Sequence, residues 1–436
     1  MPESAEVLIE RVVPGGDGLA RLEGRVVLVP GGLPGDTLRV SLAAAGPRLL
    51  RGTMVDLLSP GPVRRVESEV CPRAVDRSCG GCDWPALRLE SHRTLKTSLV
   101  VDAFRRLGGI PEAELPPFAW RGSARSYRLR NRLHVDSMGQ LGFYAAFSNR
   151  VSDLLACELV SDALLARLPG IRTALRDAGV QAGELVTLEG RDGSAVLGEL
   201  RVGGPLLAAD AERLAQRLHG PLDGMRILDG AGSEVARLGP TALQIEAGGV
   251  SFQVSVSSFF QGNRHLLDAF LEETRSVISA AAAAQGRPFD TAMDLYAGGG
   301  FLTRPLLEAV SETLAAEIDP SSSADLEANL RGWRESGASL GRAVVVRGSA
   351  ESALDARKKP IDLVLADPPR AGLSPFVRKR LLALRPKSLL LVSCDPATLA
   401  RDLASLRAGY VMKSVTLLDL FPGTHHVETM IHLSAR

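Results

Sequence analysis

From about residue 289 onwards, short apolar runs alternate with stretches of helical composition. These runs have the character of parallel strands that are buried on both faces. They read TAMDLYAGGG, TLAAEID, AVVVRGSA, IDLVLADPP, SLLLVSC and ETMIHLSA. Alternating strands and helices predict an α/β fold with a doubly wound, Rossmann-like sheet and right-handed crossovers. Ligands of such sheets bind at the carboxyl ends of the strands, so the residues at those ends are the first candidates for chemistry.

The N-terminal part of the chain has a different pattern. In residues 5–58, apolar and polar positions alternate and Gly and Pro interrupt the runs, which predicts four to five short strands of a small β-barrel. Residues 88–108 have apolar positions at helical spacing. We therefore predict three parts: a β-barrel at 1–60, a central α+β domain at 61–250 and the doubly wound domain at 251–436. The helix at 88–108 could pack on the last of these.

Composition limits the classes of protein to which the chain can belong. Its 436 residues are 45% hydrophobic, ample for a sizeable core, and its formal net charge is +1. Since this charge excludes a global basic field, any nucleic-acid surface has to be local. No apolar run approaches the ~20 residues that span a bilayer, and the N-terminus lacks the pattern of a signal peptide. We expect a cytoplasmic protein without a membrane partner.

Cys394 follows the apolar run LLLV at 389–392, and Asp395-Pro396 ends that strand at once. The cysteine is therefore expected on a loop at the tip of a strand. Three roles are open for a thiol in such a place: a small buried hydrophobe, a metal ligand or a nucleophile.

Two further strand ends predict a cofactor pocket. The segment Asp294–Gly300 is a Gly-rich turn between a strand and a helix, and Glu317 ends the next strand, where a carboxylate can accept hydrogen bonds from ribose hydroxyls. These two features fit S-adenosylmethionine and a dinucleotide equally well. They also fit a plain turn with a solvated glutamate.

The segment 367–370, Asp-Pro-Pro-Arg, narrows the choice. Two prolines stiffen the chain just past a strand and hold Asp367 at the strand end. Enzymes that methylate a planar ring need such a group beside the sulfonium, whereas dehydrogenases do not. A simple Asp-Pro-Pro turn is the alternative.

Three C-terminal segments together carry a resemblance to a known family. They are Asp-Pro-Pro-Arg at 367–370, SCDPATLARDL at 393–403 and DLFPGTHHVET at 419–429. The set resembles the RNA uracil-C5 methyltransferases, and most closely their bacterial branch that modifies 23S ribosomal RNA. The resemblance covers nearly the whole chain, since residues 1–60 resemble a TRAM domain and the early cysteines resemble the iron–sulfur loop of that branch.

The resemblance implies a role for each site residue. Carbon 5 of uracil becomes nucleophilic when a thiolate adds to carbon 6, and a base must later remove the proton from carbon 5. By position in the family, Cys394 is that nucleophile and Glu428 is that base. Four more residues are implied to contact the cofactor, S-adenosylmethionine, or the uracil: Gln261, Tyr296, Glu317 and Asp367.

Four other cysteines form a separate group: Cys71, Cys79, Cys82 and Cys157. Four thiolates suit an iron–sulfur cluster and structural zinc about equally. The resemblance implies a [4Fe–4S] cluster. The segment PRAVDRS between Cys71 and Cys79 is longer than its counterpart in the family, and a loop can absorb the difference.

Two more features bear on RNA and on metals. Five arginines at 121–132 surround Tyr127 without an acidic residue, which predicts either a local surface for phosphate contacts or a solvated strand face. They are Arg121, Arg125, Arg128, Arg130 and Arg132. His425 and His426 are adjacent, and we expect no metal there because neighbouring residues of a strand point in opposite directions.

The chain is thus interpreted as a monomeric, S-adenosylmethionine-dependent enzyme that makes 5-methyluridine in RNA, with 23S ribosomal RNA as the expected partner. The first alternative is the same chemistry on a transfer RNA or on another ribosomal uridine. An alternative of a different class is a non-catalytic iron–sulfur RNA-binding protein built on a methyltransferase scaffold. A nicotinamide dehydrogenase is disfavoured by Asp-Pro-Pro-Arg.

Overall fold

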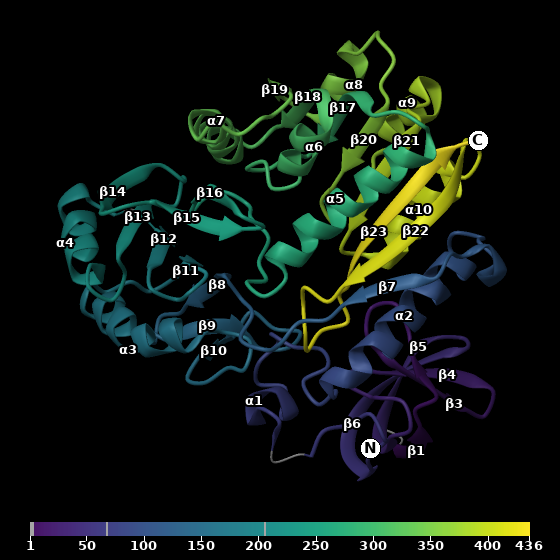
Figure 1. Ribbon diagram of the computed structural model, residues 1–436. Helices are drawn as coiled ribbons and strands as arrows, with labels where there is room; N and C mark the ends of the chain where they lie inside the picture. The colour runs from purple at the N-terminus through teal and green to yellow at the C-terminus, as the bar shows by residue number, and fades with distance from the viewer. Residues whose placement is uncertain (1–3, 67–68, 205) are drawn as a thin grey trace.

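The structure is a computed structural model that describes residues 4–66, 69–204 and 206–436 (Figure 1). The N-terminal strands, drawn in purple, and the C-terminal sheet, drawn in green and yellow, lie at opposite ends of the view, and a teal sheet projects to one side. Within the described residues, none of the helices is both long and apolar enough to cross a lipid bilayer.

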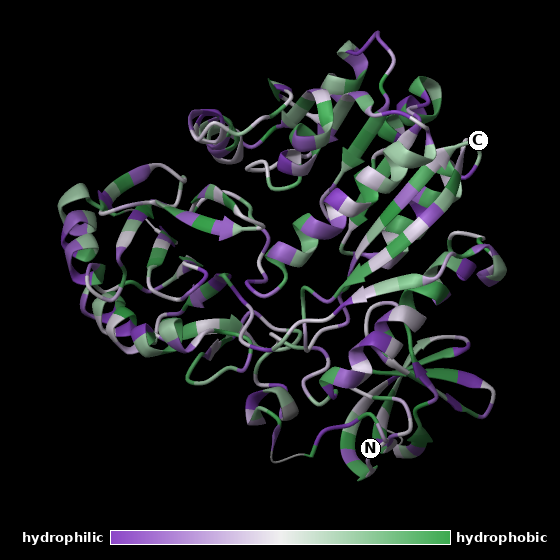
Figure 2. Cartoon of the chain, in the orientation of Figure 1, coloured by the Kyte–Doolittle hydropathy of each residue, from purple (hydrophilic) through white to green (hydrophobic). Residues whose placement is uncertain are grey.

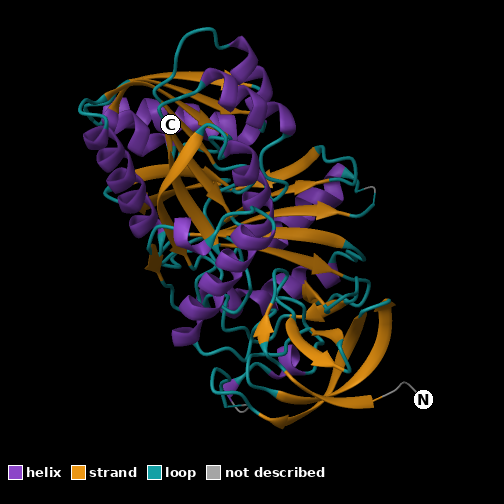
Figure 3. Ribbon diagram, turned by 90° about the vertical axis from the view of Figure 1, so that its right-hand side faces the viewer, coloured by secondary structure: helices purple, strands orange, loops and turns teal. Residues whose placement is uncertain are grey.

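The first six strands form a sheet in the order β1-β5-β6-β4-β3-β2. Figure 3 shows curled strands near the N-terminus. They are β1 (Ser4–Leu8), β2 (Arg11–Val12), β3 (Gly18–Leu22), β4 (Arg25–Val29), β5 (Thr37–Gly46) and β6 (Leu49–Ser59). Alternate residues of these strands face a common core around Val27, Leu38 and Val40. The predicted N-terminal β-domain is confirmed, with six strands instead of four to five.

A short helical segment and a long helix follow. They are α1 (Pro72–Val75) and α2 (Leu89–Arg106), with a 3₁₀ turn at Glu112–Glu114. The buried face of α2 combines Leu95, Leu99, Val100, Ala103 and Phe104 at helical spacing.

The central sheet has seven strands in the order β10-β9-β8-β11-β12-β13-β14. They are β8 (Arg130–Val135), β9 (Leu141–Tyr144), β10 (Val151–Asp153), β11 (Gly183–Glu189), β12 (Val196–Val202), β13 (Gly224–Leu228) and β14 (Glu234–Leu238). The helices α3 (Asp162–Asp177) and α4 (Ala208–Leu218) share a hydrophobic core with this sheet. A hairpin of β15 (Ala242–Ala247) and β16 (Val250–Ser255) leads into the C-terminal part.

The C-terminal sheet has eight strands in the order β19-β18-β17-β20-β21-β23-β22-β7. They are β7 (Phe118–Arg121), β17 (Phe289–Leu295), β18 (Val310–Glu317), β19 (Arg342–Arg347), β20 (Leu363–Ala366), β21 (Ser388–Ser393), β22 (Tyr410–Leu418) and β23 (Glu428–Ala435). Strands β17 to β21 pair in parallel, whereas β23 is antiparallel to both of its neighbours. The predicted α/β fold with a doubly wound sheet is confirmed.

Helices cover both faces of this sheet. They are α5 (Leu267–Ala284), α6 (Thr303–Ala309), α7 (Pro320–Glu335), α8 (Ala350–Ala356), α9 (Pro375–Leu384) and α10 (Pro396–Leu406). One hydrophobic core contains residues of α5, α6 and α7, and the other contains residues of α8, α9, α10 and α2. Figure 2 shows the strands between these layers as largely hydrophobic and the helices as mixed.

Two elements from the first third of the chain complete this C-terminal sheet. Strand β7 pairs in parallel with β22, with Phe118 opposite Val415, and forms the edge of the sheet. Helix α2 packs on α10 through Val100, Ala103 and Phe104. The division of the chain at 61 and 250 stays a prediction, but these two elements contact the sheet that the last part forms.

Candidate active site

The predicted catalytic residues come from the edge of the C-terminal sheet at which the carboxyl ends of its parallel strands lie. Cys394 follows β21, and Asp367 follows β20. Because β23 runs antiparallel, its first residue, Glu428, lies at the same edge, and its second residue, Thr429, pairs with Ser393. The sheet register therefore places Cys394 and Glu428 next to each other across two adjacent strands.

Cys394 lies in a loop that the next helix holds in place. Asp395 caps α10 by accepting hydrogen bonds from the backbone N–H groups of Ala397 (2.8 Å) and Thr398 (2.9 Å), and Pro396 starts the helix. Cys394 is half-buried. Burial, followed by the charge of Glu428, raises the pKa of its thiol to about 12, while the charge of Arg370 opposes this shift. The resting group is therefore a thiol, not a thiolate.

Glu428 is a buried carboxyl group whose negative charge is poorly compensated by neighbouring groups. Its side chain is only 4% exposed, and within the described part of the chain its Oε1 atom has no hydrogen-bond partner. Burial and the nearby charge of Asp367 raise the pKa of Glu428 well above its ordinary value. A carboxyl group in such surroundings holds a proton more tightly than an exposed one does.

Gln261 reaches the same place from the loop between β16 and α5. Its Nε2 atom donates a hydrogen bond to Oδ2 of Asp367 at 3.2 Å. Burial raises the pKa of Asp367, and this hydrogen bond opposes the shift. Asn263 fixes the loop by donating to the Leu420 carbonyl oxygen at 2.9 Å. Two of the predicted site residues, Gln261 and Asp367, thus contact each other directly.

The predicted cofactor residues line the ends of β17 and β18. Glu317 accepts hydrogen bonds from the backbone N–H groups of Gly298 (2.8 Å) and Asp319 (2.7 Å), one on each carboxylate oxygen. Tyr296 has a φ of 67° and leads into a turn in which Gly300 has a φ of 92°. A Cβ atom on Gly300 would lie 2.8 Å from Leu326 Cδ1, so the turn requires glycine there.

Asp294, at the end of β17, is a residue to which the sequence assigned no role. It is buried, and its Oδ2 atom accepts a hydrogen bond from the Thr303 hydroxyl at 2.5 Å. Burial raises its pKa to about 7. In the sequence, the only sign of this buried carboxyl group is the aspartate that begins the segment DLYAGGG.

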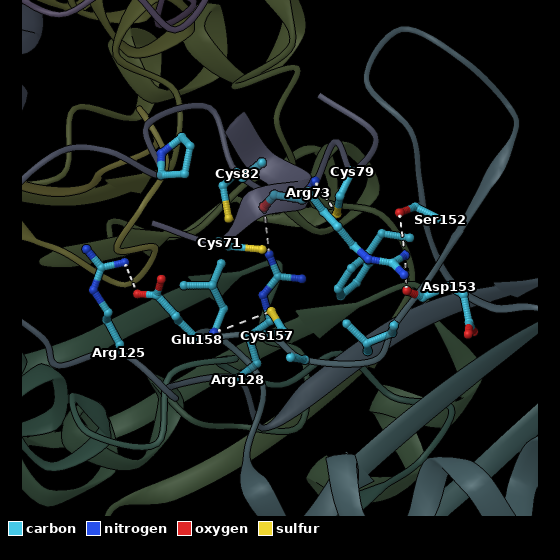
Figure 4. Close-up of a pocket in the computed structure, with 17 residues that line it drawn as sticks. Cys71, Arg73, Cys79, Cys82, Arg125, Arg128, Ser152, Asp153, Cys157 and Glu158 are labelled. Carbon is cyan, nitrogen blue, oxygen red and sulfur yellow. Dashed lines mark hydrogen bonds and ion pairs between the residues drawn. The ribbon is translucent and has the colours of Figure 1, made fainter. Parts of the chain in front are cut away.

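The four early cysteines line one pocket (Figure 4). All four are free thiols, and they are Cys71, Cys79, Cys82 and Cys157. The backbone N–H of Gly81 donates to Cys79 Sγ at 3.5 Å, and that of Leu159 donates to Cys157 Sγ at 3.4 Å. Burial, followed by the charge of Cys157, raises the pKa of Cys82 to about 12, and the charge of Arg128 opposes the shift.

All five arginines of the predicted stripe have partners within the protein. Arg125 pairs with Glu158 at 2.7 Å and Arg132 pairs with Glu184 at 3.1 Å. The other three donate to Glu273, Gly81 and Ser258: they are Arg121, Arg128 and Arg130. The side chains of Arg121 and Arg132 remain 47% and 67% exposed, so the surface for phosphate contacts stays a prediction.

His425 and His426 lie in the turn before β23, not on a strand, and their ring centroids are 4.1 Å apart. The geometric reason for expecting no metal at this pair is thus wrong. Together with Asp83 they form a group whose potential ligand atoms lie within 4.8 Å of one another. However, His426 Nε2 faces the Arg370 guanidinium at 3.2 Å, and a cation there opposes metal binding.

A buried polar cluster that sequence reasoning missed supports the segment before Glu428. Lys96 of α2 donates to Asp419 Oδ1 (2.5 Å) and to the carbonyl oxygens of Phe421 (3.1 Å) and His426 (2.6 Å). His92, one turn earlier, contacts Asp419 Oδ2 at 2.8 Å. A histidine and a lysine within the apolar stripe of a helix could have signalled this cluster.

The doubly wound fold and the comparisons with known proteins together define an S-adenosylmethionine-dependent RNA methyltransferase. The family model for tRNA (uracil-5-)-methyltransferase matches residues 240–436, and the TRAM domain model matches residues 3–55. An RNA methyltransferase of Thermosynechococcus vestitus is 32% identical over 98% of this chain and 97% of its own length. The chain belongs to the RNA uracil-5 methyltransferase family and carries a TRAM domain.

Two further comparisons also cover nearly the whole chain. An RNA methyltransferase of Streptomyces avermitilis is 29% identical, over 98% of this chain and 97% of its own length. Among solved structures, the tRNA (uracil-54, C5)-methyltransferase of Pyrococcus abyssi, in complex with S-adenosyl-L-homocysteine, superposes with a TM-score of 0.74. That match covers 98% of this chain and 99% of that one at 19% identity, so it shows a common fold.

Proposed function

We propose that this enzyme methylates carbon 5 of a uridine in 23S ribosomal RNA, with Cys394 as nucleophile and Glu428 as base. The observation that carries the proposal is the sheet register, which puts a half-buried thiol beside a buried carboxyl group at a ligand-binding edge. Asp367 and Gln261, joined by a hydrogen bond, lie at the same edge and can hold a planar ring.

The chain's own residues then have distinct tasks. Cys394 gives up its thiol proton to water as Sγ adds to carbon 6 of the uracil, and the electron pair of the 5,6 double bond moves toward carbon 5 and the carbonyl at carbon 4. S-Adenosylmethionine, when bound, supplies the methyl group that carbon 5 accepts. Glu428 takes the proton from carbon 5, the double bond re-forms, and the Cys394 thiolate leaves.

Burial and the charges around Cys394 explain why its sulfur is unreactive in the resting site. In the resting site, burial and the charge of Glu428 hold Cys394 as a thiol, while Arg370 provides the opposing positive charge. A thiol of this kind is a poor target for adventitious alkylation, because the thiolate is the reactive form. We infer that the thiolate forms only after the substrate has entered.

The cofactor is assigned to Tyr296, Glu317, Asp367 and Gln261. Each Glu317 oxygen accepts one backbone N–H and keeps a second lone pair, so the two ribose hydroxyls can both donate to it. The backbone at Tyr296 and Gly300 is turned so that a ligand can approach the strand end closely.

The cysteine pocket fits a [4Fe–4S] cluster in its donor set. Four free thiols line one pocket, two backbone N–H groups donate to sulfur, and the Arg128 guanidinium offsets negative charge. Zinc is the alternative ligand for four thiolates. Either group would be held by Cys71, Cys79, Cys82 and Cys157. Its role would be structural or in RNA binding, since methyl transfer consumes no electron.

The second candidate substrate is a uridine in transfer RNA. The matched family model has transfer RNA in its name, and the catalytic segments are shared between these substrates. The presence of four early cysteines beside a TRAM domain favours ribosomal RNA.

We further propose that the enzyme acts as a monomer in the cytoplasm. Light scattering tests the oligomeric state, and cell fractionation tests the location.

The decisive experiment maps 5-methyluridine in RNA from a strain that lacks the protein. Loss of one 5-methyluridine in 23S RNA, restored by the wild-type gene and not by Cys394→Ala, supports the proposal. Loss in transfer RNA alone overturns the ribosomal assignment. In vitro, Glu428→Gln is expected to accumulate a covalent RNA adduct, and normal turnover of this variant overturns the assignment of the base.

A further inference from the structure

The aromatic side chain most exposed within the described residues lies close to the cysteine loop. Phe147, in the turn between β9 and β10, is 86% exposed. The guanidinium carbon of Arg77 lies over its ring, 5.0 Å from the ring centroid. Arg77 belongs to the segment between Cys71 and Cys79.

Both partners of this pair have an unusual backbone. Arg77 has a φ of 60° and Phe147 has a φ of 56°, in the left-handed region that side chains other than glycine seldom adopt. Tyr296, at the proposed cofactor site, shares this property with a φ of 67°. Such conformations cost free energy and persist where the surroundings fix them, so the backbone at both residues is held by its surroundings.

The loop of residues 71–84 connects this pair to the active site. On one side, the Gly80 N–H donates to the Tyr144 carbonyl oxygen at 2.8 Å, at the base of the Phe147 turn. On the other side, the Trp84 N–H donates to the Gly423 carbonyl oxygen at 2.9 Å, and Asp83 contacts His425 Nδ1 at 2.7 Å. His425 is three residues from Glu428. The exposed ring is thus one short loop away from the catalytic segment.

An exposed ring beside a guanidinium has the chemistry of a nucleobase platform. Unpaired bases stack on aromatic rings and on guanidinium planes, and an arginine can also contact a phosphate. Arg150, exposed on the same turn, adds a second positive charge, while Asp76 is the nearby negative charge and accepts the Ser78 N–H. We propose that Arg77 and Phe147 form a stacking site for an unpaired nucleotide of the substrate RNA, outside the catalytic crevice. This inference rests on the proposed function.

The test measures RNA binding and methylation with matched variants. The binding probe is a fluorescein-labelled, 20-nucleotide single-stranded RNA pool of random sequence, followed by anisotropy. We expect Phe147→Ala to bind about tenfold more weakly and Phe147→Trp to stay within about twofold of the wild type. Met138→Ala is the matched control, because Met138 is an exposed apolar residue in the turn at the other end of β9. Arg77→Ala should reduce the salt dependence of log Kd by about one unit of slope.

Methylation of bulk RNA from the deletion strain gives a second readout. Phe147→Ala should raise KM for this RNA about tenfold and leave kcat at the wild-type value, because the stacking site does not touch the reacting atoms. Wild-type Kd and KM in Phe147→Ala would overturn the stacking site, as would a Phe147→Trp variant as weak as Phe147→Ala. If the pair instead contacts a protein partner, Phe147→Ala would keep the wild-type Kd and KM for RNA. If the wild type itself makes no 5-methyluridine, the proposed function fails instead.

Discussion

Lys96 Nζ lies 2.5 Å from Asp419 Oδ1, and both side chains are almost completely excluded from solvent. Lys96 comes from helix α2, whereas Asp419 begins the segment that leads to Glu428. The lysine also donates to two carbonyl oxygens of that segment, at Phe421 and His426. One buried ammonium group therefore fixes the path of the chain into the proposed base.

Lys96→Met is expected to lower both stability and turnover. Removing one partner of a buried ion pair leaves the other charge without compensation, which typically costs ~3–5 kcal/mol. The segment 419–427 also loses its anchor, so we expect kcat to fall about tenfold with a smaller change in KM. Urea unfolding and single-turnover methylation measure the two effects.

The double variant Lys96→Met/Asp419→Asn provides the control. Because the uncompensated carboxylate is then gone, it should be more stable than Lys96→Met alone by ~1–3 kcal/mol. Equal stability of the single and double variants would show that the two charges do not depend on each other.

The reactivity of Cys394 should follow the charges around it. Since the charge of Glu428 raises its pKa and that of Arg370 lowers it, Glu428→Gln should speed alkylation by iodoacetamide and Arg370→Ala should slow it. At a fixed pH of about 8.5, where the thiol is mostly protonated, we expect several-fold changes in opposite directions. Mass spectrometry of the peptide that contains Cys394 separates this thiol from the other four. Changes in the same direction would rule out this electrostatic account.

Asp294 predicts a pH effect on stability. Burial raises its pKa from the ordinary value of 3.8 to about 7, so the folded state holds this proton more tightly than the unfolded chain does. The contribution of Asp294 to stability therefore falls as pH rises from about 4 to about 7 and changes little above that range. Asp294→Asn lacks this titration, and it should gain stability relative to the wild type across the same window. Urea unfolding at pH 5, 6, 7 and 8 gives the free energy of unfolding of both proteins. If this free energy changed with pH in the same way for both, the prediction would be contradicted.

Removal of one pocket cysteine should remove the bound group. Cys82→Ser deletes a thiolate donor from the set of four, so anaerobically purified variant protein should lose metal relative to the wild type. Iron and sulfide analysis, with visible absorption, identifies a cluster, and zinc with no sulfide identifies the alternative. Cys394→Ser is the matched control and should retain the full metal content.

The sequence predicts well those features that depend on neighbouring residues. The run LLLVS, the break at Asp395-Pro396 and the helix after it appear in the structure as β21, an N-cap and α10. Each follows from local rules: apolar strands, an aspartate that accepts backbone N–H groups, and a proline at the first helical turn. The placement of Cys394 at a strand tip needed nothing more.

Features that depend on distant partners were not predictable in this way. The arginines at 121–132 look unpaired in the sequence because Glu158, Glu184 and Glu273 lie far along the chain. Strand β7 is only four residues long, and its partner β22 is nearly three hundred residues away. Short strands and ion pairs of this kind acquire their partners only when the fold brings them together.

The edge strand β7 also sets an order of events during synthesis. It leaves the ribosome long before β22, the strand with which it pairs, so its hydrogen-bonding groups must wait for the last part of the chain. Contacts between such distant segments slow folding, since a long loop has to close first. We expect the nascent protein to stay dependent on chaperones until its final residues emerge, and its N-terminal sheet to mature well before its catalytic centre.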